Sequence, residues 1–390
     1  DVWDFGAKEE SDEKTYKNHI TADSWNNYEN LANDGKFSAD GEAVFGDLTL
    51  NHLKNDRIYS ATANKTAGSP SGVAAYKYSD GYTAAGDYYC NGTGGNNRRN
   101  YTIANVLRGD RIDIYVGTNN STATDFYFEY VGTNRTQKDT GSIGTKNEKI
   151  SFVAKYAGSY KIWADASGGK PITNRVKRVP AVDVSGTLDL GPLTSTEGIK
   201  LKFVNETTKA ETSATLDGTS FTAKLAAGYS YNAVITGKVG YGPTNASKNI
   251  KLTDDDALSG KSDVKIVIEE KEMYVYSGTI KGFAADYARK ANLKVIMKTA
   301  EDVLSDDIEL TITGLDSATP QFTGRLEPDV EYTITLEGVN DYQVKGDKIV
   351  NQNKPYTADI EVELRPVYAA AGNFVDLDGN AVTGVKALTF

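Results

Sequence analysis

An internal repeat in the second half of the chain constrains the fold more than any other feature of the sequence. Residues 184–188 (VSGTL) recur at 276–280 (YSGTI), and residues 201–203 (LKF) recur at 293–295 (LKV). Both pairs are separated by 92 residues. Repetition at a fixed period indicates tandem copies of one structural unit.

The spacing between the copies changes further along. Residues 221–225 (FTAKL) recur at 322–326 (FTGRL), 101 residues later. We infer a nine-residue insertion in the second copy, and residues 299–307 are its most reasonable place.

Each copy ends on a stretch that alternates between apolar and polar residues, at 263–268 (DVKIVI) and 359–364 (DIEVEL). This alternation is typical of a half-buried antiparallel strand. A third copy begins near 371–373, where the chain has only a few residues left before Phe390. We therefore expect a segment of a longer protein.

The composition favours strands over helices throughout. Only 39% of residues are hydrophobic, 24 are Tyr, 37 are Gly and two are Met, which suits short strands joined by polar turns. Strands are predicted at 111–116, 125–131, 149–154 and 159–164. The expected fold is all-β, with a jelly-roll-type β-sandwich followed by tandem immunoglobulin-like or transthyretin-like sandwiches.

The repeat and the change in composition predict four parts. They are a β-sandwich over 1–180, a first repeat over 181–273, a second repeat over 274–366, and the start of a truncated third over 367–390. The first part holds 22 basic and 22 acidic residues, so the net charge of −10 lies in the repeats. A nucleic-acid partner is not expected, because neither part has a basic excess. No apolar run of about 18 residues predicts a membrane span.

The sequence shows no catalytic motif and no metal-ligand spacing. Cys90 is the only cysteine and there are two histidines, which disfavours a Cys/His metal cluster or dyad. Residues 376–380 (DLDGN) start like a calcium loop, but Ala381 and Ala387 stand where Gly and Glu are required. A hairpin turn there, and a solvated loop at 254–256 (DDD), are the favoured interpretations. Structural calcium stays open, no other cofactor is expected, and the segment is predicted not to be an enzyme.

Short motifs in the first 180 residues resemble a known module. They include residues 1–7 (DVWDFGA), 46–48 (GDL), 158–162 (GSYKI) and 168–171 (GGKP). They are similar to the carbohydrate-binding-like sandwich of large secreted pectin-degrading enzymes of Clostridia-type bacteria, in which repeats opening with VSGT often follow. The resemblance implies an extracellular, non-catalytic region that binds a pectin-like polysaccharide or a cell-wall glycan.

Sugar binding requires flat aromatic rings beside amides and charges. Two segments offer them, and their candidate binding residues are Trp25, Tyr28, Tyr88, Tyr89, Arg98 and Arg99. For an acidic glycan, the two arginines would pair with carboxylates. Trp3 and Trp163 are instead predicted to lie in the core, although Trp163 shares a strand face with Lys161 and could cover the outer face.

Two functions compete. The first is a binding and spacer region of a secreted polysaccharide-degrading protein. The alternative is a structural cell-surface protein such as an adhesin stalk, an S-layer element or a filament subunit. Pilin-type relatives of such sandwiches carry a Lys–Asn isopeptide crosslink between the first and last strands. Residues 184–188 and 276–280 contain no Lys, so no such crosslink is predicted.

Overall fold

The structure is a computed structural model. It describes residues 1–5, 12–13, 16–20, 42–51, 58–59, 77–84, 88–90, 100–118, 123–144, 147–165, 171–284, 287–290, 292–300, 305–346, 349–350 and 353–366. These residues form strands and two four-residue helices, α2 (Asp256–Ser259) and α3 (Tyr287–Lys290), which confirms the all-β prediction. Neither helix of the described part is long enough to cross a membrane.

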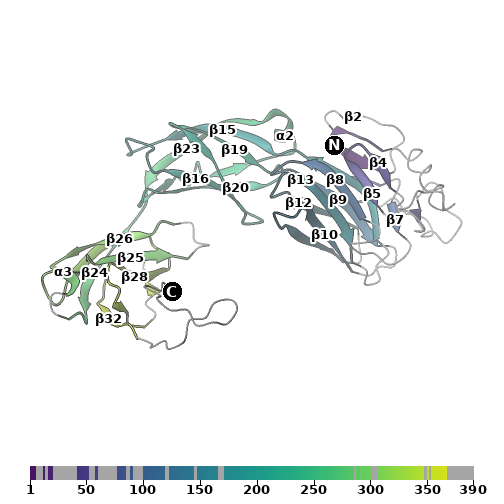
Figure 1. Cartoon of the computed structure of the whole chain (residues 1–390). Helices are drawn as coiled ribbons and strands as arrows, with labels where there is room; N and C mark the ends of the chain where they lie inside the picture. The colour runs from purple at the N-terminus through teal and green to yellow at the C-terminus, as the bar shows by residue number, and fades with distance from the viewer. Residues whose placement is uncertain are drawn as a thin grey trace, which may run out of the picture. The chain divides into compact units, whose positions relative to one another are not determined.

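The chain divides into two compact units (Figure 1). The first contains residues 1–235 and 243–269, and the second contains residues 236–242 and 270–390. The predicted third copy, at 367–390, lies outside the described residues.

The described residues up to Val179 form a sandwich of two six-stranded sheets, which we call the first sandwich. One sheet contains, in spatial order, β12 (Glu148–Val153), β9 (Arg111–Thr118), β14 (Pro171–Val179), β7 (Tyr88–Cys90) and β6 (Ile58–Tyr59), and β1 (Val2–Asp4) pairs with β14. The other contains β11 (Lys138–Ile143), β10 (Thr124–Val131), β13 (Gly158–Ala164), β8 (Asn100–Val106), β5 (Leu48–Asn51) and β4 (Ala43–Phe45). Strand β2 (Asp12–Glu13) pairs antiparallel with β3 (Tyr16–Lys17).

The core of the first sandwich is aromatic and aliphatic, and both sheets contribute to it. Phe128 stacks on Tyr160 with ring centroids 4.3 Å apart, and on Phe152 at 5.1 Å. Trp3 is fully buried, as predicted, and its indole N–H donates to the carbonyl oxygen of Phe45 at 2.7 Å. A buried indole needs such a partner, because an unpaired N–H would lose its bond to water.

The core prediction for Trp163 is wrong. In β13 the residues Tyr160, Ile162 and Ala164 point into the core, and alternation along the strand places Trp163 on the opposite face with Lys161. The strand period outweighs the general preference of a large aromatic side chain for the interior.

The first repeat is a smaller sandwich, and most of its residues belong to the same unit. One sheet contains, in order, β18 (Thr215–Asp217), β19 (Ser220–Leu225), β15 (Val182–Asp189), β23 (Lys261–Glu270) and β21 (Tyr241–Pro243). The other contains β17 (Glu211–Ser213), β16 (Lys200–Asn205), β20 (Ser230–Thr236) and β22 (Asn249–Lys251).

The second repeat belongs to the second unit. Its strands form one continuous path of β29 (Tyr342–Val344), β32 (Ile360–Leu364), β24 (Tyr274–Lys281), β27 (Gln321–Leu326), β26 (Ile308–Thr313), β25 (Lys294–Thr299), β28 (Tyr332–Glu337) and β30 (Ile349–Val350). A further strand, β31 (Tyr356–Thr357), pairs with β24. Strand β26 pairs with both β25 and β27, whereas in the first repeat this position is divided between β17 and β18.

The first and last strands of each repeat run side by side in the same direction. Strand β15 pairs with β23 in parallel, and β24 pairs with β31 and β32 in parallel. The alternating strands at 263–268 and 359–364 are therefore present, but the predicted antiparallel pairing is wrong for their contact with the first strand.

These close pairings explain the repeated glycine. A side chain on Gly186 would overlap the carbonyl oxygen of Val264, and one on Gly278 would overlap that of Ala358. The Ser-Gly-Thr motif marks the point where the backbone of the last strand approaches the first strand too closely for a Cβ atom.

Candidate functional site: the seam between the first sandwich and the first repeat

Arg111, at the start of β9, is the centre of a charged cluster where the first sandwich meets the first repeat. We call this contact region the seam. The guanidinium Nε and Nη2 donate to the two carboxylate oxygens of Asp113, each at 2.8 Å. Ser151 Oγ also donates to Asp113, at 2.7 Å. Only 6% of the Arg111 side chain and 1% of the Asp113 side chain are exposed.

The first repeat supplies the remaining partners of Arg111. Nη1 donates to the carbonyl oxygen of Ala227 at 2.5 Å, and Nη2 lies 2.8 Å from a carboxylate oxygen of Asp254. Gly228, with φ +79°, leaves the space that the guanidinium fills, because a Cβ there would overlap Nη1. Lys177 Nζ reaches the other oxygen of Asp254 at 3.1 Å.

Both members of the contact across the seam stay ionised. Burial acts to lower the pKa of Arg111, but Asp113 and Asp254 outweigh it, so the pKa is raised. Burial acts to raise the pKa of Asp254, but the charges of Arg111 and Lys177 outweigh it, so the pKa is lowered. A buried guanidinium with a bidentate carboxylate partner is a strong, geometrically specific contact.

The connection between the two sandwiches is also held. Asp110, which is 4% exposed, accepts the backbone N–H of Leu107 at 2.9 Å and that of Ala181 at 3.2 Å. Burial raises the pKa of Asp110. Because Ala181 lies in the connection, its freedom to move is reduced by the first sandwich itself.

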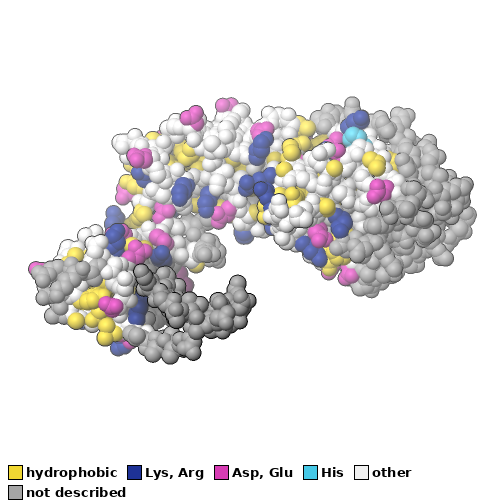
Figure 2. Space-filling view, viewed as in Figure 1, with side chains coloured by type: hydrophobic (Ala, Val, Ile, Leu, Met, Phe, Trp, Pro, Cys, Tyr) yellow, Lys and Arg dark blue, Asp and Glu magenta, His cyan; other side chains and the backbone are white. Residues whose placement is uncertain are grey.

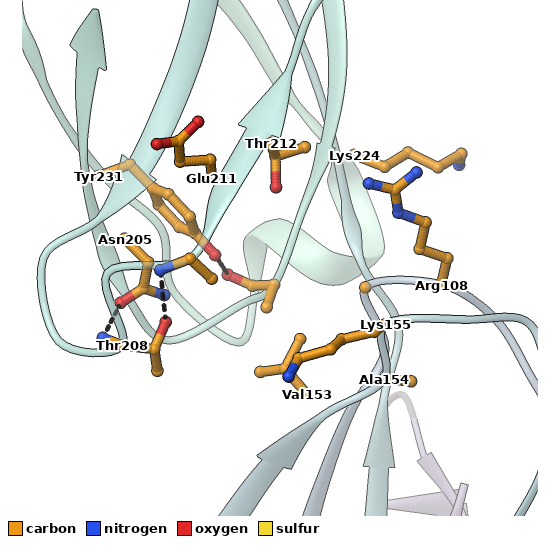
Figure 3. A pocket seen from close by; sticks show the side chains of 13 residues that line it. Arg108, Val153, Ala154, Lys155, Asn205, Thr208, Glu211, Thr212, Lys224 and Tyr231 are labelled. Atoms are coloured by element: carbon orange, nitrogen blue, oxygen red, sulfur yellow. Dashed lines mark hydrogen bonds between the residues drawn. The ribbon is translucent and has the colours of Figure 1, made fainter. Parts of the chain in front are cut away.

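A small pocket opens at the seam (Figure 3), with a volume of about 120 Å³. Arg108 and Lys155 approach it from the first sandwich, and Asn205 and Tyr231 from the first repeat. Its polar lining is largely paired internally: Tyr231 donates to the carbonyl oxygen of Ala226 at 3.0 Å, and Asn205 Oδ1 accepts two backbone N–H groups. The volume is below the roughly 300 Å³ at which ligand pockets begin. Lys and Arg side chains gather at this seam on the face shown in Figure 2.

The sequence predicts a strand at 111–116 but does not single out its polar residues as part of a site. Arg111, Asp113 and Tyr115 alternate with apolar residues along β9, and all three are buried. In the segment 254–256, where a solvated loop is expected, Asp254 forms ion pairs with Arg111 and Lys177 at the seam, and 38% of its side chain remains exposed. An Arg and an Asp two residues apart on one strand lie on one face and can pair, and that spacing was the available clue.

The sequence-predicted sugar-binding residues are not brought into a described site. Trp25, Tyr28, Arg98 and Arg99 lie outside the described residues. Tyr88 and Tyr89 lie in β7, whose backbone pairs with β14 at Thr173 and Ile172. The segment 376–380 is also outside the described part, and within that part no group of three or more His, Cys, Asp or Glu could hold a metal ion.

A lysine does lie beside a carboxylate at the first and last strands of the second repeat. Strand β24 ends at Lys281, whose Nζ donates to Asp359 Oδ2 at 2.5 Å. The bond to Asp359 raises the pKa of Lys281, and bonds from Lys281 and Thr279 lower the pKa of Asp359 to about 2. Amide formation needs an uncharged amine and a protonated carboxyl, so this pair is held in the two unreactive states.

We therefore expect the intact mass of the chain to equal that of its sequence. Mass spectrometry under denaturing conditions measures this, with Lys281→Arg as the control that should differ only by the substitution. A mass lower by one water, and restored in the control, would contradict the expectation.

Comparisons with known proteins give no family. No family model and no curated protein matches the chain. Solved structures similar to the chain include the TIE protein of Bacillus anthracis (13% identity, TM-score 0.19), matched over 73% of this chain and 64% of that one. Others are the shaft pilin SpaA of Lactobacillus rhamnosus GG (13%, 0.18; 49% of this chain, 99% of that one) and a streptococcal ancillary pilin (10%, 0.24; 62% and 92%).

These TM-scores are too low for the function of any of these proteins to be inferred for this chain. The resemblance to pectin-degrading enzymes gains no support from any of the comparisons.

Proposed function

We propose that this chain is a non-catalytic structural segment of an extracellular or cell-surface protein. In this role, tandem β-sandwiches act as a spacer, and the parts at 1–180, 181–273 and 274–366 are its successive modules. The observation that carries the proposal is the buried contact of Arg111 with Asp113, Ala227 and Asp254, which joins the first two modules.

Separating the two modules would cost free energy, and this cost keeps the junction closed. If the modules separated, Arg111 and Asp113 would stay paired, but Ala227 and Asp254 would lose a cation that is 6% exposed. Hydrogen bonds to charged groups contribute about 1.5–3 kcal/mol each. A spacer benefits from this, because a junction that does not bend keeps the distance between its ends constant.

Distance measurements on the full chain test the proposal. Spin labels at Asn134 and Asp217, in a Cys90→Ser background, report on the first sandwich and the first repeat. We expect a narrow distance distribution that broadens when Asp254→Ala removes the partner of Arg111 and Lys177. Asp255→Ala is the matched control and should leave the distribution narrow. A broad distribution in the unmodified chain would refute a rigid junction.

Pectin binding by the first module is the narrower form of the proposal. It is supported by the resemblance of residues 1–7 and 158–162 and by the Tyr–Arg segment at 88–101. Retardation of the chain in a gel containing polygalacturonate supports it, and free migration counts against it.

A further inference from the structure

The outer face of one sheet of the first sandwich carries an ordered set of aromatic and polar side chains. Register places Asn100, Trp163, Tyr127 and Thr140 side by side on β8, β13, β10 and β11. Asn100 is buried and accepts a hydrogen bond from Asn51, so the accessible part of this line is Trp163, Tyr127 and Thr140. Since neighbouring strands lie about 4.8 Å apart, these side chains form a row across the sheet. We call this set the aromatic row.

Trp163 and Tyr127 form the centre of the aromatic row. Their rings stack with centroids 4.1 Å apart and planes inclined by 24°. Lys138 Nζ lies 4.7 Å from the Tyr127 centroid and 4.9 Å from the Trp163 centroid. Both rings are half-buried, so part of each remains accessible on the face of a rigid sheet.

A second row of polar groups runs beside the first. Register aligns Thr102, Lys161, Glu129 and Lys138 on the same four strands. Glu129 accepts the indole N–H of Trp163 at 3.1 Å, which fixes the orientation of the ring. Aromatic rings flanked by hydroxyl, amide and charged groups match a sugar, whose C–H face is apolar and whose edge carries hydroxyls.

Carboxylates around the rings determine whether the site favours a neutral or an acidic sugar. Asp125 lies two residues from Tyr127 on β10, and Asp165 lies two residues from Trp163 at the end of β13, so alternation places both carboxylates on the face that carries the rings. The backbone N–H of Asp165 donates to the carbonyl oxygen of Asp125 at 2.8 Å, which holds the two residues side by side. With Glu129 they outnumber the two lysines, Lys138 and Lys161. Carboxylates accept hydrogen bonds from sugar hydroxyls, but they repel the carboxylates of an acidic polysaccharide.

We propose that the aromatic row binds a neutral polysaccharide. The chain would stack against Trp163 and Tyr127, while its hydroxyls donate to Glu129, Asp125 and Asp165 and accept from Lys138. This site differs from the Tyr–Arg segment at 88–101 in both place and charge preference. It is independent of whether the segment serves as a rigid spacer.

Affinity electrophoresis of the full chain tests the proposal. The probes are gels containing glucomannan, xyloglucan or mixed-linkage β-glucan, with polygalacturonate as the acidic probe. We expect retardation by at least one neutral polymer through the aromatic row. Any retardation by polygalacturonate, through the Tyr–Arg segment at 88–101, should not depend on Trp163. Trp163→Ala should weaken binding about tenfold, which is the effect of losing one aromatic stacking contact.

Tyr156→Ala is the matched control. Tyr156 is also a half-buried tyrosine of the first sandwich, and it packs under Arg135 away from the aromatic row. It should leave retardation unchanged. Tyr127→Ala repeats the test from a second strand, so a folding defect of one variant does not decide the outcome.

Three results would overturn the proposal. One is the absence of retardation by every neutral polymer. Another is retardation that survives both Trp163→Ala and Tyr127→Ala. The third is equal retardation by polygalacturonate that depends on Trp163, since that would make the charge selection wrong.

Discussion

Replacing Asp113 by alanine is expected to lower the free energy of unfolding of the first unit by about 3–5 kcal/mol. The change leaves the buried guanidinium of Arg111 with Asp254 and the carbonyl oxygen of Ala227, without the bidentate carboxylate that it binds at 2.8 Å through two nitrogens. Removing one partner of a buried ion pair costs far more than the pair contributes, because the remaining charge has lost water as well. Urea denaturation followed by tryptophan fluorescence measures this.

Asp183→Ala is the control for the Asp113 experiment. Asp183 also binds a cation, with Lys224 Nζ at 2.5 Å, but 73% of its side chain is exposed. Exposed ion pairs contribute little to the free energy of unfolding, so the midpoint of the urea denaturation curve should move only slightly. If the two variants shift the midpoint equally, the claim that burial of Arg111 stabilises the seam is wrong.

Acid should weaken the seam in a defined direction. The folded-state pKa of Asp254 lies below its unfolded value of about 3.9, so its contribution to stability is present above that value. It is lost as the pH falls through the folded pKa, when the carboxylate takes up a proton. Asp254→Asn should flatten this part of the stability profile, and an unchanged profile would contradict the assignment.

The second large effect is expected at the repeated glycine. Gly278→Ala should lower the free energy of unfolding of the second repeat by about 3 kcal/mol, because the added methyl overlaps the backbone of Ala358 and forces β24 and β31 apart. All three tryptophans, Trp3, Trp25 and Trp163, precede the repeats. Calorimetry should therefore show one transition moving while the tryptophan fluorescence transition stays in place.

Ser277→Ala is the control for the glycine experiment. Its hydroxyl has a neighbour at 3.4 Å in Thr357, and the substitution adds no atom near the backbone. Only a small shift of the calorimetric transition of the second repeat is expected for Ser277→Ala. Comparable losses for Ser277→Ala and Gly278→Ala would mean that the close approach of the strands is not the reason for the glycine.

The sequence predicts the β class, the tandem repeat and most strand positions because these depend on local periodicity. The strands expected at 111–116, 125–131, 149–154 and 159–164 are β9, β10, β12 and β13. Parallel pairing of the first and last strands was missed, since alternation gives the two faces of a strand and says nothing about its direction.

The seam could not be predicted for a related reason. Alternation identifies Arg111 and Asp113 as one polar face, but only the packing of the first repeat against that face makes it buried. Trp163 shows the opposite case, in which the strand period was informative and the preference of tryptophan for the core was misleading.

The direction of the terminal strands in each repeat has a mechanical consequence. In the first repeat the chain enters along β15 and leaves along β23, and the two strands are parallel and hydrogen-bonded from Val184 to Asp189. A force that pulls the two ends of the repeat apart therefore slides the strands along each other and loads these bonds together rather than one at a time. Strands β24 and β32 repeat the arrangement. Forced unfolding is governed by the rate of barrier crossing, so each repeat is built to resist tension along the chain.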